Sequence, residues 1–207
     1  MSEQSRAHWD NVYVTKDDSE VSWFQQTPAM SLALIDLARV SPDAAIIDIG
    51  GGASHLVDHL LSRGYRDVTV LDISDAALSL ARERIAQPLA ENVSWIVADA
   101  TQWQPTRSYD LWHDRAAFHF LVEAADRAAY VARVKQAVAI GGHVIIGTFA
   151  KDGPEMCSGL PVRRYDADGL AAELGDGFTL IASRRDDHAT PRQNVQPFQF
   201  CLFRRVG

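Results

Sequence analysis

The sequence predicts an α/β domain built on a mostly parallel sheet of about seven strands, with helices on both faces. Three observations lead to this prediction. Short apolar runs alternate with segments of helical periodicity between residues 45 and 148. Glycine, proline or a capping residue separates most of these segments. The last two apolar runs have no helical pattern between them, so we expect them to pair as an antiparallel hairpin.

The first half of the pattern alternates strand and helix. The first strand is predicted to be a buried parallel strand, because residues 45–49 are mostly apolar and three glycines follow them directly. Each following helix has a recognisable end, Gly64 for the first and Pro88 for the second. The strands expected here are 45–49, 68–72 and 93–97, and the helices are 54–63 and 74–87.

The second half continues the alternation up to the hairpin. Two glycines, Gly141 and Gly142, are expected to separate a helix from the fifth strand. A long loop, 149–164, follows that strand, and loops of this length usually have a role. His188, between the hairpin strands, is expected at the surface. The strands predicted here are 109–113, 143–148, 178–183 and 198–203, and the helices are 126–138 and 166–174.

Length and composition favour one cytoplasmic domain. A chain of 207 residues suffices for a single substantial core, and we divide it into an N-terminal cap (1–40), a ligand-binding core (41–150) and a substrate loop with terminal strands (151–207). The net charge of −7 argues against a protein that coats a nucleic acid. The two cysteines form no metal or redox motif, and no metal-ligand cluster stands out. Neither a signal peptide nor a membrane span is predicted.

A glycine turn follows the first strand and is the strongest candidate for a ligand site. It reads Asp48-Ile-Gly50-Gly51-Gly52-Ala-Ser54. A dinucleotide loop would place a third glycine at His55, so that match is incomplete. The carboxylate of Asp48 would repel a diphosphate but suits a ligand with an ammonium and a sulfonium. The charge pattern therefore favours S-adenosylmethionine as the cofactor.

This loop resembles the first motif of the class I S-adenosylmethionine-dependent methyltransferases, which have a Rossmann-like fold. The resemblance covers roughly residues 40–150 and implies further cofactor contacts at the following strand ends. Asp72 and Ile73 match the step whose acid holds the ribose hydroxyls, and Asp99-Ala100 matches the segment that meets the adenine. The spacing of Asp72 would also suit a nicotinamide enzyme.

The end of the fourth strand should face the transferred methyl group. It carries His113, Asp114, Arg115 and His119, an unusually polar group beside an apolar helix. We expect His113 to contact the cofactor, Arg115 to contact the substrate, and Asp114 or His119 to accept a proton. The motifs that grip exocyclic amines of bases or attack cytosine are missing from this stretch, which argues against familiar base methylation.

Two other segments are candidates for the substrate side. The N-terminal W-D-x-x-Y motif resembles several small-molecule and protein-lysine methyltransferases, and it carries Tyr13 as a catalytic candidate. Trp23, further along, is expected to contact the substrate from a lid that excludes water. Cys157, in the long loop, is a third candidate for substrate contact, although a lone cysteine is more often a plain loop residue.

The sequence therefore predicts a methyltransferase that acts on a small molecule. Few residues remain to build a docking domain for a macromolecule, but a protein-lysine N-methyltransferase is a real alternative. A nicotinamide-dependent oxidoreductase and a non-catalytic adenosyl-binding module are alternatives from other classes. Nothing in the sequence identifies the acceptor.

Overall fold

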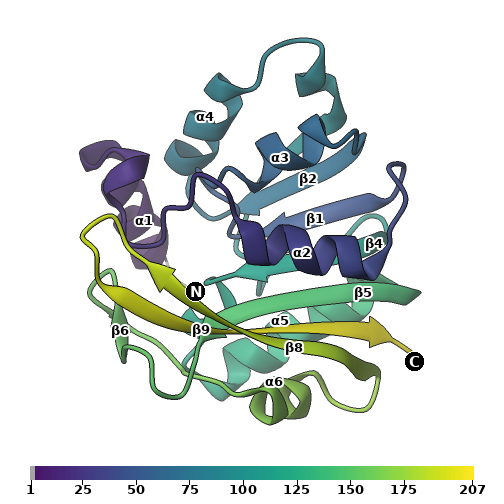
Figure 1. Ribbon diagram of the computed structural model, residues 1–207. Coiled ribbons are helices and arrows are strands. Elements are labelled where there is room, and N and C mark those ends of the chain that lie inside the picture. The colour runs from purple at the N-terminus through teal and green to yellow at the C-terminus, as the bar shows by residue number, and fades with distance from the viewer. Residues whose placement is uncertain (1–2) are drawn as a thin grey trace.

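The computed structural model describes residues 3–207 and contains the predicted sheet. Its seven strands run in the order β3-β2-β1-β4-β5-β9-β8 (Figure 1). The first five pair in parallel, and β9 pairs antiparallel with both β5 and β8. The bounds are Ala45–Ile49 (β1), Asp67–Asp72 (β2), Val93–Val97 (β3), Tyr109–Arg115 (β4), Val138–Phe149 (β5), Phe178–Ala189 (β8) and Val195–Arg205 (β9).

Helices cover both faces of this sheet, as the alternation predicts. One core contains side chains of three helices that lie on the same face, α2 (Ala29–Ala38), α3 (Leu56–Ser62) and α4 (Asp75–Arg84). The other core contains side chains of α5 (Ala124–Ala137) and α6 (Ala167–Leu174). Neighbouring residues of β1 separate into the two cores, because successive side chains of a strand point to opposite faces. Ile46 packs on the first side and Ile47 on the second.

One segment stands outside this layered arrangement. Helix α1 (Glu3–Thr15) lies at the end of the sheet rather than on one of its faces, and it packs beside α4 (Figure 1). The first two residues of the predicted 1–40 cap lie outside the described part of the chain. Val12 is the one buried residue of α1. The helix is therefore attached mainly through partly exposed side chains that contact the site described below.

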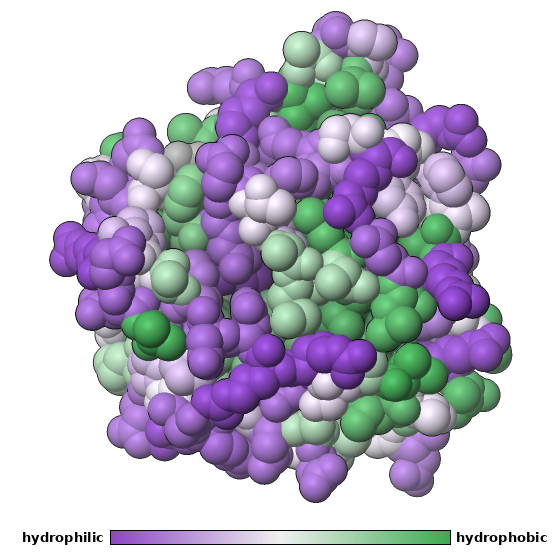
Figure 2. All heavy atoms as spheres, in the orientation of Figure 1, coloured by the Kyte–Doolittle hydropathy of each residue, from purple (hydrophilic) through white to green (hydrophobic). Residues whose placement is uncertain are grey.

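Short elements complete the chain. Residues 3–207 include three 3-10 turns, η1 (Asp18–Glu20), η2 (Leu89–Asn92) and η3 (Phe118–Phe120). Within the long loop, β6 (Met156–Cys157) and β7 (Leu160–Pro161) form a small separate hairpin. Figure 2 shows hydrophobic residues gathered over α2 within a largely hydrophilic face. None of the helices in residues 3–207 is long and apolar enough to span a membrane.

The terminal strands differ from the prediction in length. β5 begins at Val138 and runs through both glycines, because Tyr109 pairs with Val138 before a bulge restores the register at Leu111. The hairpin strands also extend beyond the apolar runs, since backbone pairing continues through polar residues as far as Ala189 and Val195. His188 therefore lies on a strand and is 5% exposed, where we expected it at the surface.

Candidate functional site

The glycine turn between β1 and α3 is shaped by close contacts. The amide of Gly50 donates to the carbonyl of Leu71 at 2.7 Å, which ties the turn to β2. Gly50 has a φ of +64°, and a Cβ there would lie 2.6 Å from the Cβ of Ala117. Gly52 has a φ of +43°, with the Asp72 carboxylate 3.0 Å from its missing Cβ. Glycine lets the backbone pass next to Ala117 at position 50 and next to Asp72 at position 52.

Asp48 lies behind this turn in a buried hydrogen-bonded chain. It is opposite His113 in the pairing of β1 with β4, and its Oδ1 is 2.7 Å from Nδ1 of His113. The other ring nitrogen, Nε2, is 2.8 Å from Oγ of Ser31 on α2. A Cβ on Gly51 would lie 2.6 Å from Oδ2 of Asp48. The carboxylate is therefore held by His113 and lies directly against the glycine turn.

Asp72 ends β2 at the opposite side of the turn. Its Oδ1 accepts a hydrogen bond from the amide of Ser74 at 2.8 Å. Burial raises the pKa of Asp72 to about 7, and the nearby carboxylates of Asp48 and Asp10 add to that increase. Ile73 follows it and lines the same cavity. An acid in this position is ready to accept hydrogen bonds from hydroxyl groups.

The end of β3 contributes small side chains. Ala98 and Ala100 line the cavity next to Asp72. The carboxylate of Asp99 instead accepts hydrogen bonds from the amide and hydroxyl of Thr101, at 2.9 and 2.7 Å. The structure therefore brings Ala100 to the cavity and leaves the Asp99 side chain in the turn beside it.

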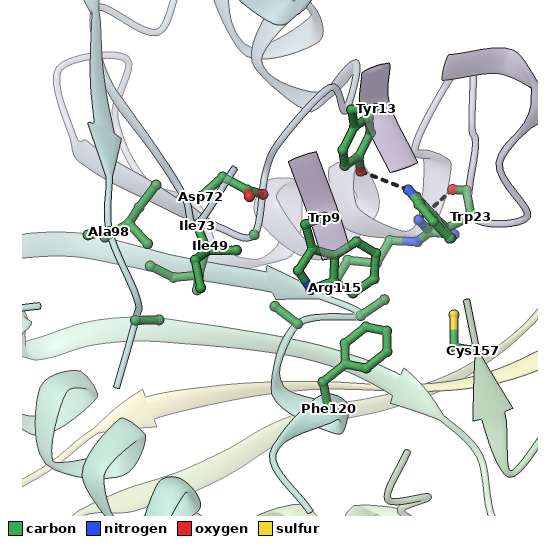
Figure 3. A pocket seen from close by; sticks show the side chains of 15 residues that line it. Trp9, Tyr13, Trp23, Ile49, Asp72, Ile73, Ala98, Arg115, Phe120 and Cys157 are labelled. Carbon is green, nitrogen blue, oxygen red and sulfur yellow. Dashed lines mark hydrogen bonds between the residues drawn. The ribbon is translucent and has the colours of Figure 1, made fainter. Parts of the chain in front are cut away.

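A cavity of about 690 Å³ opens between these strand ends and the N-terminal segment (Figure 3). One end is formed by Asp72, Ile73 and the two alanines. The other end is aromatic, because Trp9 packs edge-on against Trp23 and Phe120 with ring centroids 5.7 and 5.0 Å apart. The full lining is Trp9, Tyr13, Trp23, Ile49, Gly50, Leu71, Asp72, Ile73, Ala98, Ala100, Arg115, Ala116, Ala117, Phe120 and Cys157.

A second cavity, of about 580 Å³, adjoins the first on the other side of the glycine turn. Asp48, Gly51, Ser54 and His113 line it. Of these, Ser54 also accepts a hydrogen bond from the amide of Leu56 at 3.1 Å. Four residues line both cavities and mark their junction, namely Tyr13, Trp23, Gly50 and Arg115.

Helix α1 covers the first cavity. Its Asp10 accepts a hydrogen bond from the hydroxyl of Ser74 at 2.6 Å, next to Asp72. The hydroxyl of Tyr13 accepts a hydrogen bond from Nε1 of Trp23 at 3.1 Å (Figure 3). At the opposite end, Nε2 of His8 is 3.3 Å from Oγ of Ser158 in the long loop. The cover is thus attached both to the strand ends and to the loop.

The two proton acceptors predicted on β4 and η3 lie beneath the cavity floor and do not line it. Asp114 is fully buried and accepts hydrogen bonds from Tyr130 Oη at 2.6 Å and from two amides, those of Ala117 and Phe118, at 3.0 Å. Burial raises its pKa to about 6. Burial and the charge of Arg115 lower the pKa of His119 to about 3. Of the three predicted catalytic residues, only Tyr13 lines the cavity.

The three predicted substrate residues all line the first cavity. Trp23 and Arg115 meet through the hydrogen bond that Nη1 of Arg115 donates to the Trp23 carbonyl at 2.8 Å. Cys157 lies on β6, where burial raises the pKa of its thiol to about 11. No group of metal-ligating side chains occurs among residues 3–207.

Several lining residues were not predicted. Phe120 carries no signal of its own, because an aromatic residue in an apolar stretch usually belongs to the core. Ser31 is a polar residue within an apolar helix, and this is the only pattern in the sequence that hints at its contact with His113. Ala98 and Leu71 are ordinary strand residues whose position, rather than type, brings them to the site.

Comparisons with known proteins agree on one kind of domain. Residues 46–142 match a family described as "Methyltransferase domain". Nodulation protein S of Rhizobium tropici is 26% identical to this chain over the aligned residues. The alignment covers 60% of this chain and about half (51%) of that protein. EEF1A lysine methyltransferase 2 of Danio rerio is 23% identical over 88% of both chains.

The fold is also shared with solved structures. The 1,6-didemethyltoxoflavin-N1-methyltransferase of Burkholderia thailandensis, solved with 1,6-didemethyltoxoflavin and S-adenosylhomocysteine, superposes with a TM-score of 0.69. The two chains are 20% identical, and the match covers 99% of this chain and 85% of the other. The two proteins therefore share the fold of the sheet and its covering helices.

Proposed function

Residues 46–142 form a class I S-adenosylmethionine-dependent methyltransferase domain, and from this premise we propose that the protein methylates a small molecule. The enclosed aromatic end of the first cavity carries this proposal. Trp9, Trp23 and Phe120 form a wall beneath the cover of α1. These three rings, together with Tyr13 and Cys157, line one end of the cavity, and a pocket of mostly apolar and aromatic side chains with a few polar groups is typical of small-ligand sites.

The residues around the glycine turn fit the cofactor. Gly50 lines both cavities and has no side chain, so a ligand can contact its backbone directly. We assign the ribose hydroxyls to Asp72, whose Oδ2 faces the turn, and the adenine to the small residues Ala98 and Ala100. The amino-acid end then lies in the second cavity, near Asp48 and His113.

Bound S-adenosylmethionine supplies a methyl group on a positively charged sulfur. The protein's own contribution is mainly to position and to exclude water. Trp9 and Phe120 present flat apolar surfaces to an acceptor, and α1 closes the cavity above them. We place the Tyr13 hydroxyl at the junction of the cavities as the group that orients the acceptor's nucleophilic atom, held there by Trp23.

Asp114 has a positioning role in this proposal. It accepts hydrogen bonds from the amides of Ala117 and Phe118 and so fixes the segment of the cavity floor that touches Gly50.

The family match argues against the nicotinamide-dependent alternative. Protein-lysine methylation remains the second candidate, because the EEF1A lysine methyltransferase 2 of Danio rerio aligns over 88% of both chains.

The test uses S-adenosylmethionine with a labelled methyl group. The purified protein is incubated with the dialysable and the non-dialysable fractions of a bacterial extract. We expect label in a dialysable product, and we expect Trp9→Leu to reduce its formation while Val14→Ala, on the exposed side of the same helix, does not. Label confined to protein would replace this proposal with the lysine candidate. Bound cofactor without any labelled product would favour a non-catalytic module.

A further inference from the structure

Arg115 brings a guanidinium group to the junction of the two cavities. It is the last residue of β4 and lines both cavities. Its Nη1 donates to the carbonyl of Trp23, and its Cζ lies 4.9 Å from the ring centre of Phe198. Figure 3 shows the guanidinium group beside Trp23, with the dashed contact to that carbonyl. The side chain is therefore fixed from two directions.

The remaining nitrogen atoms of this guanidinium have no partner. Nε and Nη2 are buried and make no hydrogen bond, and no ion pair within residues 3–207 involves Arg115. Burial lowers the pKa of Arg115 to about 10, and the carboxylates of Asp186 and Asp48, which form no ion pair with it, offset only part of that effect. The Nε–H and Nη2–H bonds of a guanidinium are parallel, and together they match the two oxygens of one carboxylate.

We propose that Nε and Nη2 of Arg115 bind a ligand carboxylate in a bidentate manner at this junction. The proposal rests on the proposed function, which offers two sources: the amino-acid carboxylate of the cofactor, or an acid group on the acceptor. Arg115 is the only lysine or arginine among the described residues that line either cavity.

The position of Arg115 relative to Asp48 favours the cofactor as the source. The amino-acid end of S-adenosylmethionine carries an ammonium and a carboxylate. The second cavity has the acid of Asp48 against the glycine turn and the cation of Arg115 at its border. A cavity lined by one anion and one cation complements such a zwitterion.

The first arm of the test compares two cofactor products by calorimetry. S-adenosylhomocysteine and its analogue with hydrogen in place of the carboxylate are titrated into the wild type and three variants. In the wild type we expect the carboxylate to improve affinity about tenfold to 100-fold. Arg115→Met should abolish this difference, and Arg115→Lys, which keeps the charge without the fork, should retain part of it. Arg66→Met, at an exposed arginine that precedes β2, should retain all of it.

The second arm tests the acceptor as the source. Benzoate and benzamide are titrated into the protein with and without S-adenosylhomocysteine. If the wild type binds benzoate more tightly than benzamide and Arg115→Met removes this preference, the proposal is supported with the acceptor as the source of the carboxylate. If neither the cofactor pair nor the benzoate pair shows a preference that depends on Arg115, the proposal is overturned.

The two arms also separate this proposal from the proposed function. If the folded protein binds no S-adenosylhomocysteine, the proposed function fails, and the benzoate comparison without cofactor still decides the role of Arg115. Thermal melting of each variant verifies folding. If Arg115→Met does not fold, Arg115→Lys is used for the test. An unchanged preference for the carboxylate in Arg115→Lys would then count against bidentate binding by Nε and Nη2.

Discussion

Ser74 donates its hydroxyl to the carboxylate of Asp10 at 2.6 Å, and this bond joins the N-terminal helix to the strand end that carries Asp72. The same hydroxyl accepts the amide of Ala77 and so caps α4. One serine therefore connects the cover, the cofactor side of the cavity and a helix of the core. This relationship gives the first prediction.

Asp10→Ala should loosen the cover without disturbing α4, because it leaves the cap of Ser74 in place. We expect S-adenosylhomocysteine to bind about threefold to tenfold more weakly, in line with the loss of one hydrogen bond. Amide exchange in α1 should become faster, while exchange in α4 stays as it is. Asp36→Ala, an exposed acid paired with Arg63, is the control. Unchanged exchange in α1 would show that the Asp10 contact does not hold the cover.

Asp72→Asn should separate cofactor binding from stability. A pKa raised to about 7 in the folded state, against 3.8 for an ordinary Asp, means that ionisation of Asp72 weakens the fold as pH rises from about 4 to 7. The ligand-free variant should therefore be more stable than the wild type at about pH 8, by on the order of 1–3 kcal/mol. Urea titrations at about pH 4 and pH 8 measure this, and a stability gain that is the same at both would contradict the assignment.

The binding consequence of the same change has the opposite sign. The ionised carboxylate is the better acceptor for two hydroxyls, so wild-type affinity for S-adenosylhomocysteine should fall as pH is lowered from about 8 to 6. Asp72→Asn should bind at least about 100-fold more weakly at pH 8 and lose this pH dependence. Calorimetry at several pH values tests both statements. Full affinity in the variant would rule out the ribose assignment.

Gly50→Ala should block the cofactor site through a steric clash as well as through backbone strain. Its Cβ would lie 2.6 Å from the Cβ of Ala117, at a φ of +64°. Gly64→Ala is a matched control, because Gly64 has a φ of +87° and no atom within 4 Å of its missing Cβ. Strain alone should cost each variant about 1 kcal/mol of stability, and the clash with Ala117 should make the loss larger in Gly50→Ala. Only Gly50→Ala should also lose cofactor binding, and equal binding in the two variants would refute the close approach.

Asp114→Asn should destabilise the protein rather than change its chemistry. The carboxylate accepts the Tyr130 hydroxyl and two amides inside the core, and losing one or more of these bonds should cost about 2–4 kcal/mol. The variant is assayed with the first acceptor found, at a temperature where it stays folded. A stable variant whose kcat falls by a factor of about 100 or more would instead mark Asp114 as the proton acceptor.

Much of the framework follows from local pattern. The apolar run of β1, the glycines after it and the spacing to Asp72 predict the proposed cofactor end, because strand order and crossover length place these residues at the same edge of the sheet. The hairpin of β8 and β9 is likewise predicted by the missing helix between them. These features depend on residues that are close in sequence.

The rest of the site depends on contacts between distant segments. His113 and Arg115 are two residues apart on β4, yet one joins Asp48 and Ser31 while the other reaches Trp23. Asp114, between them, points to the opposite face and is paired with Tyr130. The sequence shows a polar cluster, but which member faces the cavity is decided by the strand's alternation and by partners that no local pattern reveals.

The family match begins at residue 46, whereas Trp9 and Trp23 lie before it and Cys157 lies beyond its end at residue 142. In the proposed function, the cofactor site and much of the acceptor wall are thus encoded in separate stretches of the chain. The choice of acceptor can therefore change through substitutions in the segments before and after residues 46–142, while the cofactor-binding residues stay the same. Chimaeras that graft residues 1–40 and 151–165 from a relative onto this sheet are accordingly a direct route to enzymes with altered acceptors.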